Sequence, residues 1–365
     1  MSPLPDDRHW LGLALDLAAK GRYTCAPNPM VGAVVVCDDA CVGQGWHRRP
    51  GEPHAEINAL HEAAGNARGA TLVVSLEPCS TSGRTPPCTD AIIAAGIARV
   101  VVGTLDPNPA HRGRGLDLLL HHGIAVELVN DPAAERLNEK FNHFMGTGMP
   151  FVHAKWAMSL DGKSATRSRD ARWISGESSR GIVHRMRAEH EAVMVGIGTV
   201  LADNPRLDVR LDGEWRQQEK VVVDSSLRTP ADALLLKGAP AIIACRMGAE
   251  PARKDALEAA GARVIELPAA GQGVDLRALL SLLGRENITS VLVEGGSMLL
   301  GGLFDRQLVQ RVTVFIAPMV IGGQGAPGPV AGGGVEHLAS ALRLTDIETR
   351  QSDGDLLVSG RVSAG

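Results

Sequence analysis

The sequence predicts an α/β protein of two domains, each with three layers in which helices cover both faces of a sheet. A chain of 365 residues is too long for one ordinary core and fits about two domains of typical size. Short β-rich runs alternate with stretches of helical spacing on both sides of a Gly-Thr-Gly linker at residues 146–148. We therefore expect one domain at 1–148 and a second at 149–365.

In the first domain, apolar residues at helical spacing and prolines that precede helical stretches mark the helices. We expect helices at 10–18, 54–64, 88–95 and 132–144. Strands are expected at 31–37, 71–76 and 100–104. The alternation of these two kinds of element is the basis for the three-layer expectation.

The second domain repeats the pattern with its own series of β-rich runs. We expect strands near 151–158, 192–196, 220–224, 241–245, 263–267, 290–294 and 311–317. Two later runs, near 342–349 and 355–362, are expected to close an otherwise parallel sheet in the antiparallel sense.

Composition disfavours several classes of protein. The net charge is −4, aromatic residues make up 3%, and residues 1–148 hold 12 Lys and Arg against 16 Asp and Glu, so nucleic-acid binding or editing is disfavoured. No secretory signal and no apolar run of about 20 residues is present, which predicts a cytoplasmic protein without membrane contact. In that reducing compartment, six cysteines suggest metal binding or catalysis rather than disulfides.

One group of residues has the composition of a catalytic zinc site. The stretch PHAEINAL supplies His54 and Glu56, and EPCSTSGRTPPC supplies Cys79 and Cys88. One imidazole and two thiolates leave the fourth tetrahedral position of a zinc ion open for water. Zinc lowers the pKa of such a water, and a carboxylate that is not a ligand can carry protons to departing ammonia. We expect the imidazole and the thiolates to hold zinc, with Glu56 as general acid and base.

Taken separately, the parts of this group have ordinary explanations. A histidine with an acid two positions later is usually a surface feature, and two cysteines nine positions apart are usually small hydrophobic residues. Positions two apart on a helix do not share a face, so His54 and Glu56 can serve one metal only if it lies beyond the helix end. The remaining cysteines have no supporting motif, and we expect them to be packing residues: Cys25, Cys37, Cys41 and Cys245.

In the second domain, a β-rich run ends at Glu294 and is followed by Gly295 and Gly296 before a helical stretch. Backbone amides at such a turn can hold a phosphate or pyrophosphate, because glycine allows close approach. A simple tight turn is the alternative. The stretch that begins at Gly196 lacks the third glycine of the standard dinucleotide fingerprint.

Eight short stretches, distributed over both domains, form two sets. The first set is PNPMVGAVVV (27–36), GWHRRPGEPHAE (45–56), EPCSTSGRTPPC (77–88) and DPNP (106–109). The second set is KWAMSLDGK (155–163), RWIS (172–175), GIGTVLADNPRLDVR (196–210) and VEGGSMLLGGL (293–303). They resemble the deaminase half and the reductase half of the RibD family, bifunctional proteins of riboflavin biosynthesis. The resemblance implies a cytidine-deaminase-like domain followed by a dihydrofolate-reductase-like domain.

By this resemblance, the first domain is a zinc-dependent hydrolase that deaminates 2,5-diamino-6-ribosylamino-4(3H)-pyrimidinone 5′-phosphate. The second is an NADPH-dependent oxidoreductase that reduces the ribosyl group of the product, giving 5-amino-6-ribitylamino-uracil 5′-phosphate. The resemblance therefore implies zinc and NADPH as cofactors and small phosphorylated pyrimidines as ligands. We also expect a homo-oligomer.

The resemblance also assigns individual residues. In the first domain it places the substrate against Asn28, His47, Arg84 and Asn108. In the second it places NADPH against Ala157, Trp173, Thr199, Asp203, Ser225, Gly295 and Gly296, and the substrate against Lys155, Arg187, Leu207, Arg210 and Glu294. Guanidinium groups suit the substrate phosphate. Alternatives stay open for three residues: a solvated surface charge for Arg84, core packing for Trp173 and the capping of a turn for Asp203.

Three positions depart from the family pattern. Thr81 stands where the family has histidine, and Ala171 where it has serine. Arg169 stands where the family has a glycine, whose left-handed backbone costs other residues energy. These changes leave two hypotheses open, a reductase whose zinc is only structural and a ligand-binding or regulatory protein without turnover.

Overall fold

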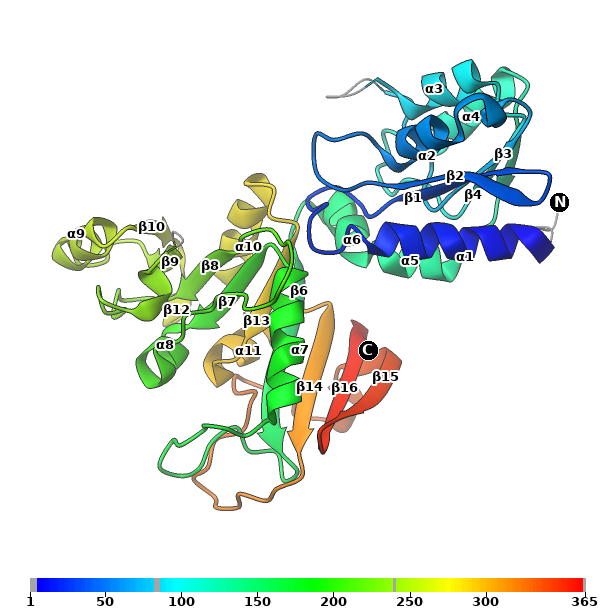
Figure 1. The fold of residues 1–365 in the computed structure, drawn as a ribbon. Helices are drawn as coiled ribbons and strands as arrows, with labels where there is room; N and C mark the ends of the chain where they lie inside the picture. Colours follow the sequence, from blue (N-terminus) through cyan, green and yellow to red (C-terminus); the bar gives the residue numbers. More distant parts are fainter. Residues whose placement is uncertain (1–4, 82–85, 239–240, 364–365) are drawn as a thin grey trace. The chain divides into compact units, whose positions relative to one another are not determined.

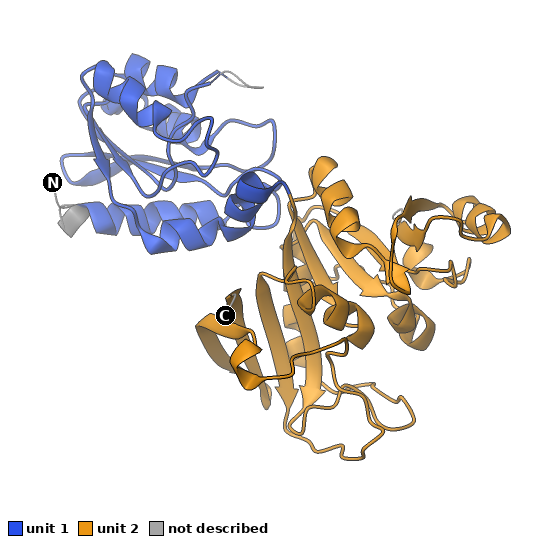
Figure 2. Cartoon of the chain, turned by 180° about the vertical axis from the view of Figure 1, so that it is seen from behind, with its two compact units in different colours: residues 1–148 blue, residues 149–365 orange. Residues whose placement is uncertain are grey.

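The computed structural model describes residues 5–81, 86–238 and 241–363 (Figure 1). The chain divides into two compact units, residues 1–148 and residues 149–365 (Figure 2). No helix in the described part of the chain combines the length and the apolar character needed to cross a bilayer. Arg84, which the sequence analysis placed against the substrate, lies outside the described residues.

The described residues of unit 1 form a five-stranded sheet in the order β2-β1-β3-β4-β5. Its strands are β1 (Gly32–Cys37), β2 (Ala40–Trp46), β3 (Thr71–Val74), β4 (Arg99–Val102) and β5 (Ala125–Leu128). Strand β1 pairs antiparallel with β2 and β3, whereas β3, β4 and β5 are parallel. The parallel half therefore presents the carboxyl ends of three strands at one edge.

Helices cover both faces of this sheet, as the sequence predicts. They are α1 (Pro5–Ala19), α2 (Ala55–Ala63), α3 (Cys88–Ala95), α4 (Arg114–His121), α5 (Pro132–Leu137) and α6 (Glu139–Thr147), with a 3₁₀ turn at Ala64–Ala67. Alternate residues of β1 enter opposite cores, because side chains along a strand point to opposite faces. Val34 packs with Leu11 of α1, and Val35 packs with the core under α2, α3 and α4.

The single helix expected over 132–144 is wrong, since α5 ends at Leu137 and α6 begins at Glu139. The break lies at Asn138, whose buried side chain accepts a hydrogen bond from the Met30 amide and donates one to the Met30 carbonyl, both 2.8 Å long. This tertiary contact fixes Asn138 outside helical geometry.

The cysteines expected to be packing residues differ in their outcome. Cys25 and Cys245 are buried and Cys37 is half-buried against the core, which agrees with packing. Cys41 is exposed, so that expectation is wrong for this residue. Cys41 lies at the start of β2, the edge strand, where the first two residues face solvent.

The described residues of unit 2 form a nine-stranded sheet in the order β10-β9-β8-β7-β13-β6-β14-β16-β15. Its strands are β6 (Phe151–Ser159), β7 (Ala192–Gly196), β8 (Glu219–Val223), β9 (Ala241–Arg246), β10 (Ala262–Leu267), β13 (Ser290–Glu294), β14 (Arg311–Ala317), β15 (Arg343–Ser352) and β16 (Asp355–Ser363). All are parallel from β10 to β14, and the last two pair antiparallel, which confirms the expected closure. A small hairpin, β11 (Ala269–Ala270) and β12 (Gly273–Val274), forms a separate two-stranded sheet, and Val274 packs in the core of the large sheet.

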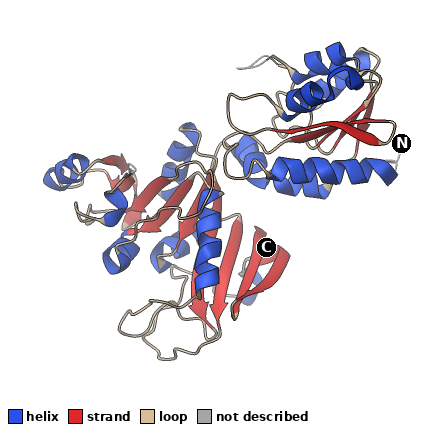
Figure 3. Ribbon diagram, viewed as in Figure 1, coloured by secondary structure: helices blue, strands red, loops and turns tan. Residues whose placement is uncertain are grey.

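Helices also cover both faces of this second sheet (Figure 3). One face packs against α10 (Leu276–Arg285) and α11 (Ser297–Phe304), and the other against α7 (Glu177–Ala188), α8 (Ile197–Asp203) and α9 (Pro251–Ala259). Two 3₁₀ turns complete the unit, at Leu234–Leu236 and Leu338–Ser340. The three-layer expectation is therefore confirmed for both halves of the chain.

The amino end of α7 is held by the turn between β15 and β16. The buried carboxylate of Asp355 accepts hydrogen bonds from the Gly176 amide at 2.8 Å and the Ser179 hydroxyl at 2.6 Å. A carboxylate at this position satisfies amides that the helix leaves unpaired and complements the helix dipole. The contact fixes the helix whose last turn carries Arg187.

Candidate active sites

The first candidate site begins at the amino end of α2. His54 is the N-cap residue, with extended backbone angles of −70° and 166°, and Glu56 is the second residue of the helix. The histidine is therefore outside the helix, which meets the condition for sharing a site with Glu56. The helix lies directly on β2, because a Cβ atom added at Gly45 would be 2.4 Å from the carbonyl oxygen of Ala55.

The structure brings His54, Cys79 and Cys88 together. Their ligand atoms all lie within 4.8 Å of one another. Nδ1 of His54 is 3.2 Å from Sγ of Cys88 and 3.6 Å from Sγ of Cys79. In a tetrahedral zinc site with ordinary bond lengths, nitrogen and sulfur ligands lie roughly 3.5 Å apart. The spacing of the three side chains is therefore compatible with one shared zinc ion.

Hydrogen bonding adapts the two thiols to metal binding. The hydrogen bond between Cys88 and Cys79 lowers the pKa of the Cys79 thiol and raises the pKa of the Cys88 thiol. The backbone amide of Cys88, at the start of α3, also donates to Sγ of Cys79 at 3.3 Å. The pair therefore favours one thiolate and one thiol, and a metal ion would displace the remaining proton.

Glu56 is buried beside these ligands. Burial raises the pKa of the Glu56 carboxyl to about 7, because removal from water disfavours its charged form. A carboxyl group that titrates near neutrality can both accept and donate a proton at ordinary pH. This is the property that a proton carrier beside the ligands needs.

His47 and Asn28 form a second pair next to the ligands. Nδ2 of Asn28 lies 2.9 Å from Nε2 of His47, and an amide nitrogen can only donate, so Nε2 accepts. The His47 proton is then on Nδ1, 3.3 Å from the carbonyl oxygen of Pro53. Burial also lowers the pKa of His47, which favours this neutral form. The ring centroids of His47 and His54 are 5.3 Å apart, so the expected substrate contact adjoins the ligand set.

Asn108 lies on a loop that Glu77 organises. The buried Glu77 carboxylate accepts hydrogen bonds from the amides of Asp106 at 3.1 Å, Gly113 at 2.9 Å and Gly115 at 2.9 Å. The sequence interpretation gave Glu77 no role, although an acid immediately before the Pro-Cys pair was a signal that could have suggested one. Glu77 thus links the turn that carries Cys79 to the loop that carries Asn108.

The second candidate site begins at the carboxyl end of β13. Gly295 and Gly296 have φ angles of +80° and +84°, and α11 starts at the next residue. A Cβ atom added at Gly296 would lie 3.4 Å from Oγ1 of Thr199 and 3.5 Å from the amide nitrogen of Gly196. Two glycine-containing turns, after β13 and after β7, therefore lie side by side. Backbone amides at turns of this kind, before the start of a helix, are suited to a pyrophosphate.

The other residues expected to contact NADPH lie in varied surroundings. Ser225 follows β8, and Ala157 of β6 is half-buried against the core under α7. The Asp203 carboxylate pairs with Arg172 at 3.4 Å. Trp173 is 67% exposed, so the alternative of core packing is wrong; the Arg180 guanidinium lies 4.7 Å from its ring centroid.

The residues expected to contact the reductase substrate centre on an ion pair. Arg187 of α7 donates to Glu294 through Nε at 2.5 Å and a terminal nitrogen at 2.8 Å. Burial opposes the charge of Glu294, yet Arg187 holds the pKa of this carboxyl below its usual range. Lys155 is the register partner of Glu294 on β6, and burial lowers the pKa of its amine. Three ionisable groups from α7, β13 and β6 therefore meet at one point.

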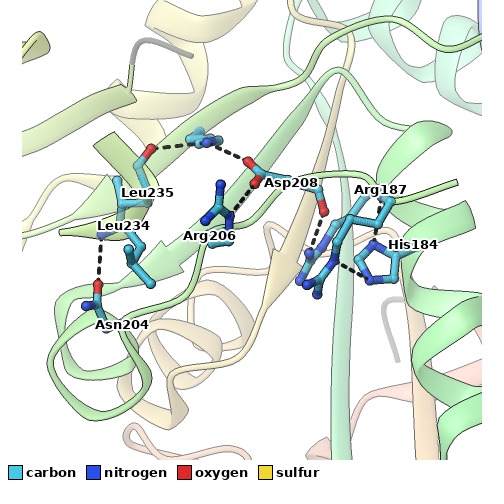
Figure 4. A network of polar contacts seen from close by, with 9 residues as sticks. His184, Arg187, Asn204, Arg206, Asp208, Leu234 and Leu235 are labelled. Atoms are coloured by element: carbon cyan, nitrogen blue, oxygen red, sulfur yellow. Dashed lines mark hydrogen bonds and ion pairs between the residues drawn. The ribbon is translucent and has the colours of Figure 1, made fainter. Parts of the chain in front are cut away.

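The segment after α8 continues this site (Figure 4). Arg187 donates to the carbonyl oxygen of Asp208 at 2.8 Å, while the Asp208 carboxylate pairs with Arg206 at 3.0 Å and Lys220 at 2.8 Å. Leu207 is buried in the core, with a φ angle of +58°. A cavity of about 740 Å³ is lined by this segment, including Leu207 and Arg210.

Arg210 reaches α7 through His184. Its backbone amide lies 3.2 Å from Nδ1 of His184, and its Nε lies 3.4 Å from Nε2 of the same ring. Burial and the charges of Arg187 and Arg210 lower the pKa of His184, which favours a neutral ring between the two guanidinium groups. Arg187 is committed to Glu294 and Asp208, so Arg210 is the more available cation of the two.

Comparisons with known proteins match both units to known families. The RibD C-terminal domain family matches residues 150–358, and the cytidine and deoxycytidylate deaminase zinc-binding region matches residues 5–104. The riboflavin biosynthesis protein RibD of Aquifex aeolicus is 39% identical over 355 residues, which cover 96% of this chain and 97% of that protein. The chain belongs to the RibD family. RibD of Escherichia coli is 40% identical, with coverage of 96% and 98%.

Solved RibD structures share the fold over nearly the whole chain. Acinetobacter baumannii RibD superposes with a TM-score of 0.88 at 35% identity, covering 99% of this chain and 100% of that one. The diaminohydroxyphosphoribosylaminopyrimidine deaminase/5-amino-6-(5-phosphoribosylamino)uracil reductase of Thermotoga maritima gives 0.84 at 34% identity, with coverage of 98% and 99%. As a RibD protein, the chain is a deaminase fused to a reductase of riboflavin biosynthesis, with zinc and NADPH as cofactors.

The positions that depart from the RibD pattern have clear structural settings. Arg169 adopts a φ angle of +70°, so it does occupy the left-handed backbone expected of a glycine. The turn around it is closed by hydrogen bonds between the backbones of Thr166 and Arg169 at 3.0 Å and of Thr166 and Asp170 at 2.9 Å. Thr81 is exposed at the edge of the described loop.

Proposed function

We propose that unit 1 deaminates 2,5-diamino-6-ribosylamino-4(3H)-pyrimidinone 5′-phosphate and that unit 2 reduces the ribosyl group of the product with NADPH. The observation that carries the proposal is the convergence of His54, Cys79 and Cys88 within 4.8 Å, with the buried Glu56 beside them. Three ligands leave one tetrahedral position open, which is typical of catalytic zinc rather than structural zinc.

In the deaminase, His54, Cys79 and Cys88 would hold zinc, which when bound supplies an activated water for attack on a ring carbon. Glu56 takes a proton and returns it to the leaving ammonia, a role that its raised pKa suits. The neutral His47 orients the carboxamide of Asn28, and Glu77 holds the loop of Asn108. Arg84, outside the described residues, would contact the substrate phosphate.

In the reductase, NADPH when bound supplies hydride. The turns at Gly295–Gly296 and Gly196–Thr199 would bind its pyrophosphate, and Trp173, Asp203 and Ala157 would line the rest of the cofactor.

On the substrate side, the pair of Arg187 and Glu294 would orient the sugar next to Lys155. Leu207 would line the cavity in which the substrate binds. Arg210 would bind the substrate phosphate, because its guanidinium is less committed than that of Arg187.

A coupled assay with the diaminopyrimidinone phosphate, NADPH and added zinc tests both activities, because ammonia and NADPH are followed separately. Glu56→Gln should reduce ammonia release by about 10²- to 10⁴-fold, the usual contribution of a general acid and base, and leave NADPH oxidation by the deaminated intermediate intact. Zinc without ammonia release in the unmodified protein would support a reductase with structural zinc. Absence of both activities would support a ligand-binding protein.

Two further parts of the proposal concern the protein in its cell. We infer that the protein is a cytoplasmic enzyme. We also infer that it is a homo-oligomer, and this second inference rests on its likeness to the family. Light scattering of the purified protein would measure the oligomeric state, and a monomeric mass would contradict that inference.

A further inference from the structure

The break between α5 and α6 is bonded to the segment that leads into β1. Asn138 lies at this break, and its side chain is only 4% exposed. Its carboxamide satisfies both backbone groups of Met30, because Oδ1 accepts from the amide and Nδ2 donates to the carbonyl, each at 2.8 Å. In the described part of the chain, Met30 makes no other backbone hydrogen bond. The pair α5 and α6 supplies no zinc ligand and no expected substrate contact, so the function described above gives these buried bonds no role.

The position of Met30 constrains the position of Asn28, two residues earlier. Pro29 lies between them, and the ring of a proline fixes its own φ angle and restricts the backbone of the residue before it. The next residue, Val31, accepts a hydrogen bond from the His47 amide at 2.9 Å. The segment that carries Asn28 is therefore short and stiff, and it is held at Met30 by Asn138 and at Val31 by the backbone of His47.

Asn28 is the point at which this segment reaches the deaminase site. Its Nδ2 lies 2.9 Å from Nε2 of His47, whose ring centroid is 5.3 Å from that of His54. A carboxamide has two N–H donors and one carbonyl oxygen. His47 occupies one donor, and among the described residues none pairs with the other donor or with the oxygen. These two groups can form hydrogen bonds with a heterocycle or a sugar hydroxyl, so the orientation of the carboxamide decides whether the substrate is bound.

We propose that Asn138 is a positioning residue of the deaminase, which holds the carboxamide of Asn28 in its substrate-binding orientation through its two hydrogen bonds to Met30. The proposal rests on the deaminase function of unit 1, since it adds a residue to that site. It makes the break between α5 and α6 part of the site, although Asn138 itself touches neither the substrate nor the metal.

The kinetic test measures the deaminase reaction of the full-length, zinc-loaded protein. Asn138→Ala should raise KM for the diaminopyrimidinone phosphate by about 5- to 100-fold, the combined effect of two hydrogen bonds between neutral groups. Saturating substrate should restore most of kcat, and zinc content and reductase kinetics should not change. Asn142→Ala is the matched control, because this asparagine lies one turn later and donates only to the Glu135 carbonyl. An unchanged KM, or a loss of kcat alone, would overturn the proposal.

A double substitution separates positioning from a general loss of structure. Asn28→Ala alone should raise KM, and adding Asn138→Ala to it should change KM by less than about twofold, because the second residue acts through the first. Multiplied effects in the double variant would overturn the proposal. If Asn138→Ala does not fold, Asn138→Asp has the same shape and loses the donor to the Met30 carbonyl. It should then show the same raised KM and the same dependence on Asn28, and an unchanged KM would be equally decisive against the proposal.

A measurement without substrate separates this proposal from the proposed reaction. Nitrogen NMR of histidine-labelled, zinc-loaded protein should show His47 with its proton on Nδ1 and with Nε2 as acceptor, as its bond to Asn28 requires. Asn138→Ala should shift these ring signals, whereas Asn142→Ala should not. Unchanged His47 signals in folded Asn138→Ala would overturn the positioning role. Shifted signals in a protein that releases no ammonia would preserve the positioning role and reject the deaminase function.

Discussion

Glu77→Gln tests whether the loop of Asn108 depends on one buried carboxylate. Oε2 of Glu77 accepts from the amides of Asp106 and Gly113, and Oε1 accepts from the amide of Gly115. A glutamine has only one carbonyl oxygen, so its amino group must face at least one of these donors. At least one and at most two buried amides are then left without an acceptor.

The magnitude follows from the number of hydrogen bonds that the substitution removes. A hydrogen bond to a charged group contributes about 1.5 to 3 kcal/mol, so the loss of one or two such bonds should destabilise the ordered loop by about 1.5 to 6 kcal/mol. If the open loop becomes populated, the apparent affinity for substrate falls by the fraction that remains ordered, up to about 100-fold. None of the three zinc ligands belongs to the loop of Asn108, whose amides lose their acceptor, so the zinc content should not change.

The assay is the deaminase reaction with substrate varied, together with zinc analysis and thermal unfolding. We expect a raised KM for the pyrimidine, about one zinc per chain and unchanged reductase kinetics. Glu135→Gln, an exposed glutamate on α5, is the matched control and should behave as the unmodified protein. An unchanged KM in a folded, zinc-loaded Glu77→Gln protein would refute the reasoning, and so would loss of zinc with retained substrate affinity in the residual activity.

Two further substitutions test how the fold supports each site. Gly45→Ala places a Cβ atom 2.4 Å from the Ala55 carbonyl oxygen, so α2 must shift. We expect a loss of about 1 to 3 kcal/mol in unfolding free energy and weaker zinc retention against a chelator. The control Gly65→Ala, which has open space around its Cβ, should retain zinc normally. Asp355→Ala removes the carboxylate that caps α7. Denaturant titration should show a loss of about 1 to 2 kcal/mol in the unfolding free energy of unit 2, and NADPH oxidation should be slower. An unchanged midpoint of the denaturant transition would contradict the capping role.

The strands of unit 2 could be predicted closely because buried parallel strands are continuous β-branched runs. The expected strand at 290–294 coincides with β13, and that at 311–317 coincides with β14. In contrast, β2 was not predicted. Its glycines at 43 and 45 remove the side-chain pattern of a strand, and their reason is the close approach of α2, which only the folded chain reveals.

The break between α5 and α6 had no local signal either. Residues 132–144 have helical spacing throughout, and the interruption at Asn138 depends on its hydrogen bonds with Met30, 108 residues earlier in the chain. A tertiary contact here overrides local propensity. The same limit applies to Arg187 and Glu294: the sequence suggested both as substrate contacts, but not that they pair with each other across 107 positions.

The zinc ligands could be predicted because the residue types that bind this metal are few and their motifs are local. Their convergence could not be deduced from spacing, since it requires the cap of α2, the turn after β3 and the start of α3 to meet. The role of Glu77 was missed for a related reason. Its place immediately before the Pro-Cys pair was the one available signal, because its partners are backbone amides 29 to 38 positions away, which carry no signature of their own.

X-ray absorption at the zinc edge is the most direct test of the ligand set. The purified protein should hold one zinc per chain, with two sulfur neighbours at about 2.3 Å, one imidazole nitrogen at about 2.0 Å and one further oxygen or nitrogen. Cys88→Ser should remove one sulfur or the metal itself, whereas Glu56→Gln should keep the spectrum. A metal-replete preparation without zinc, or a first shell lacking the two sulfurs, would contradict the account of the deaminase site.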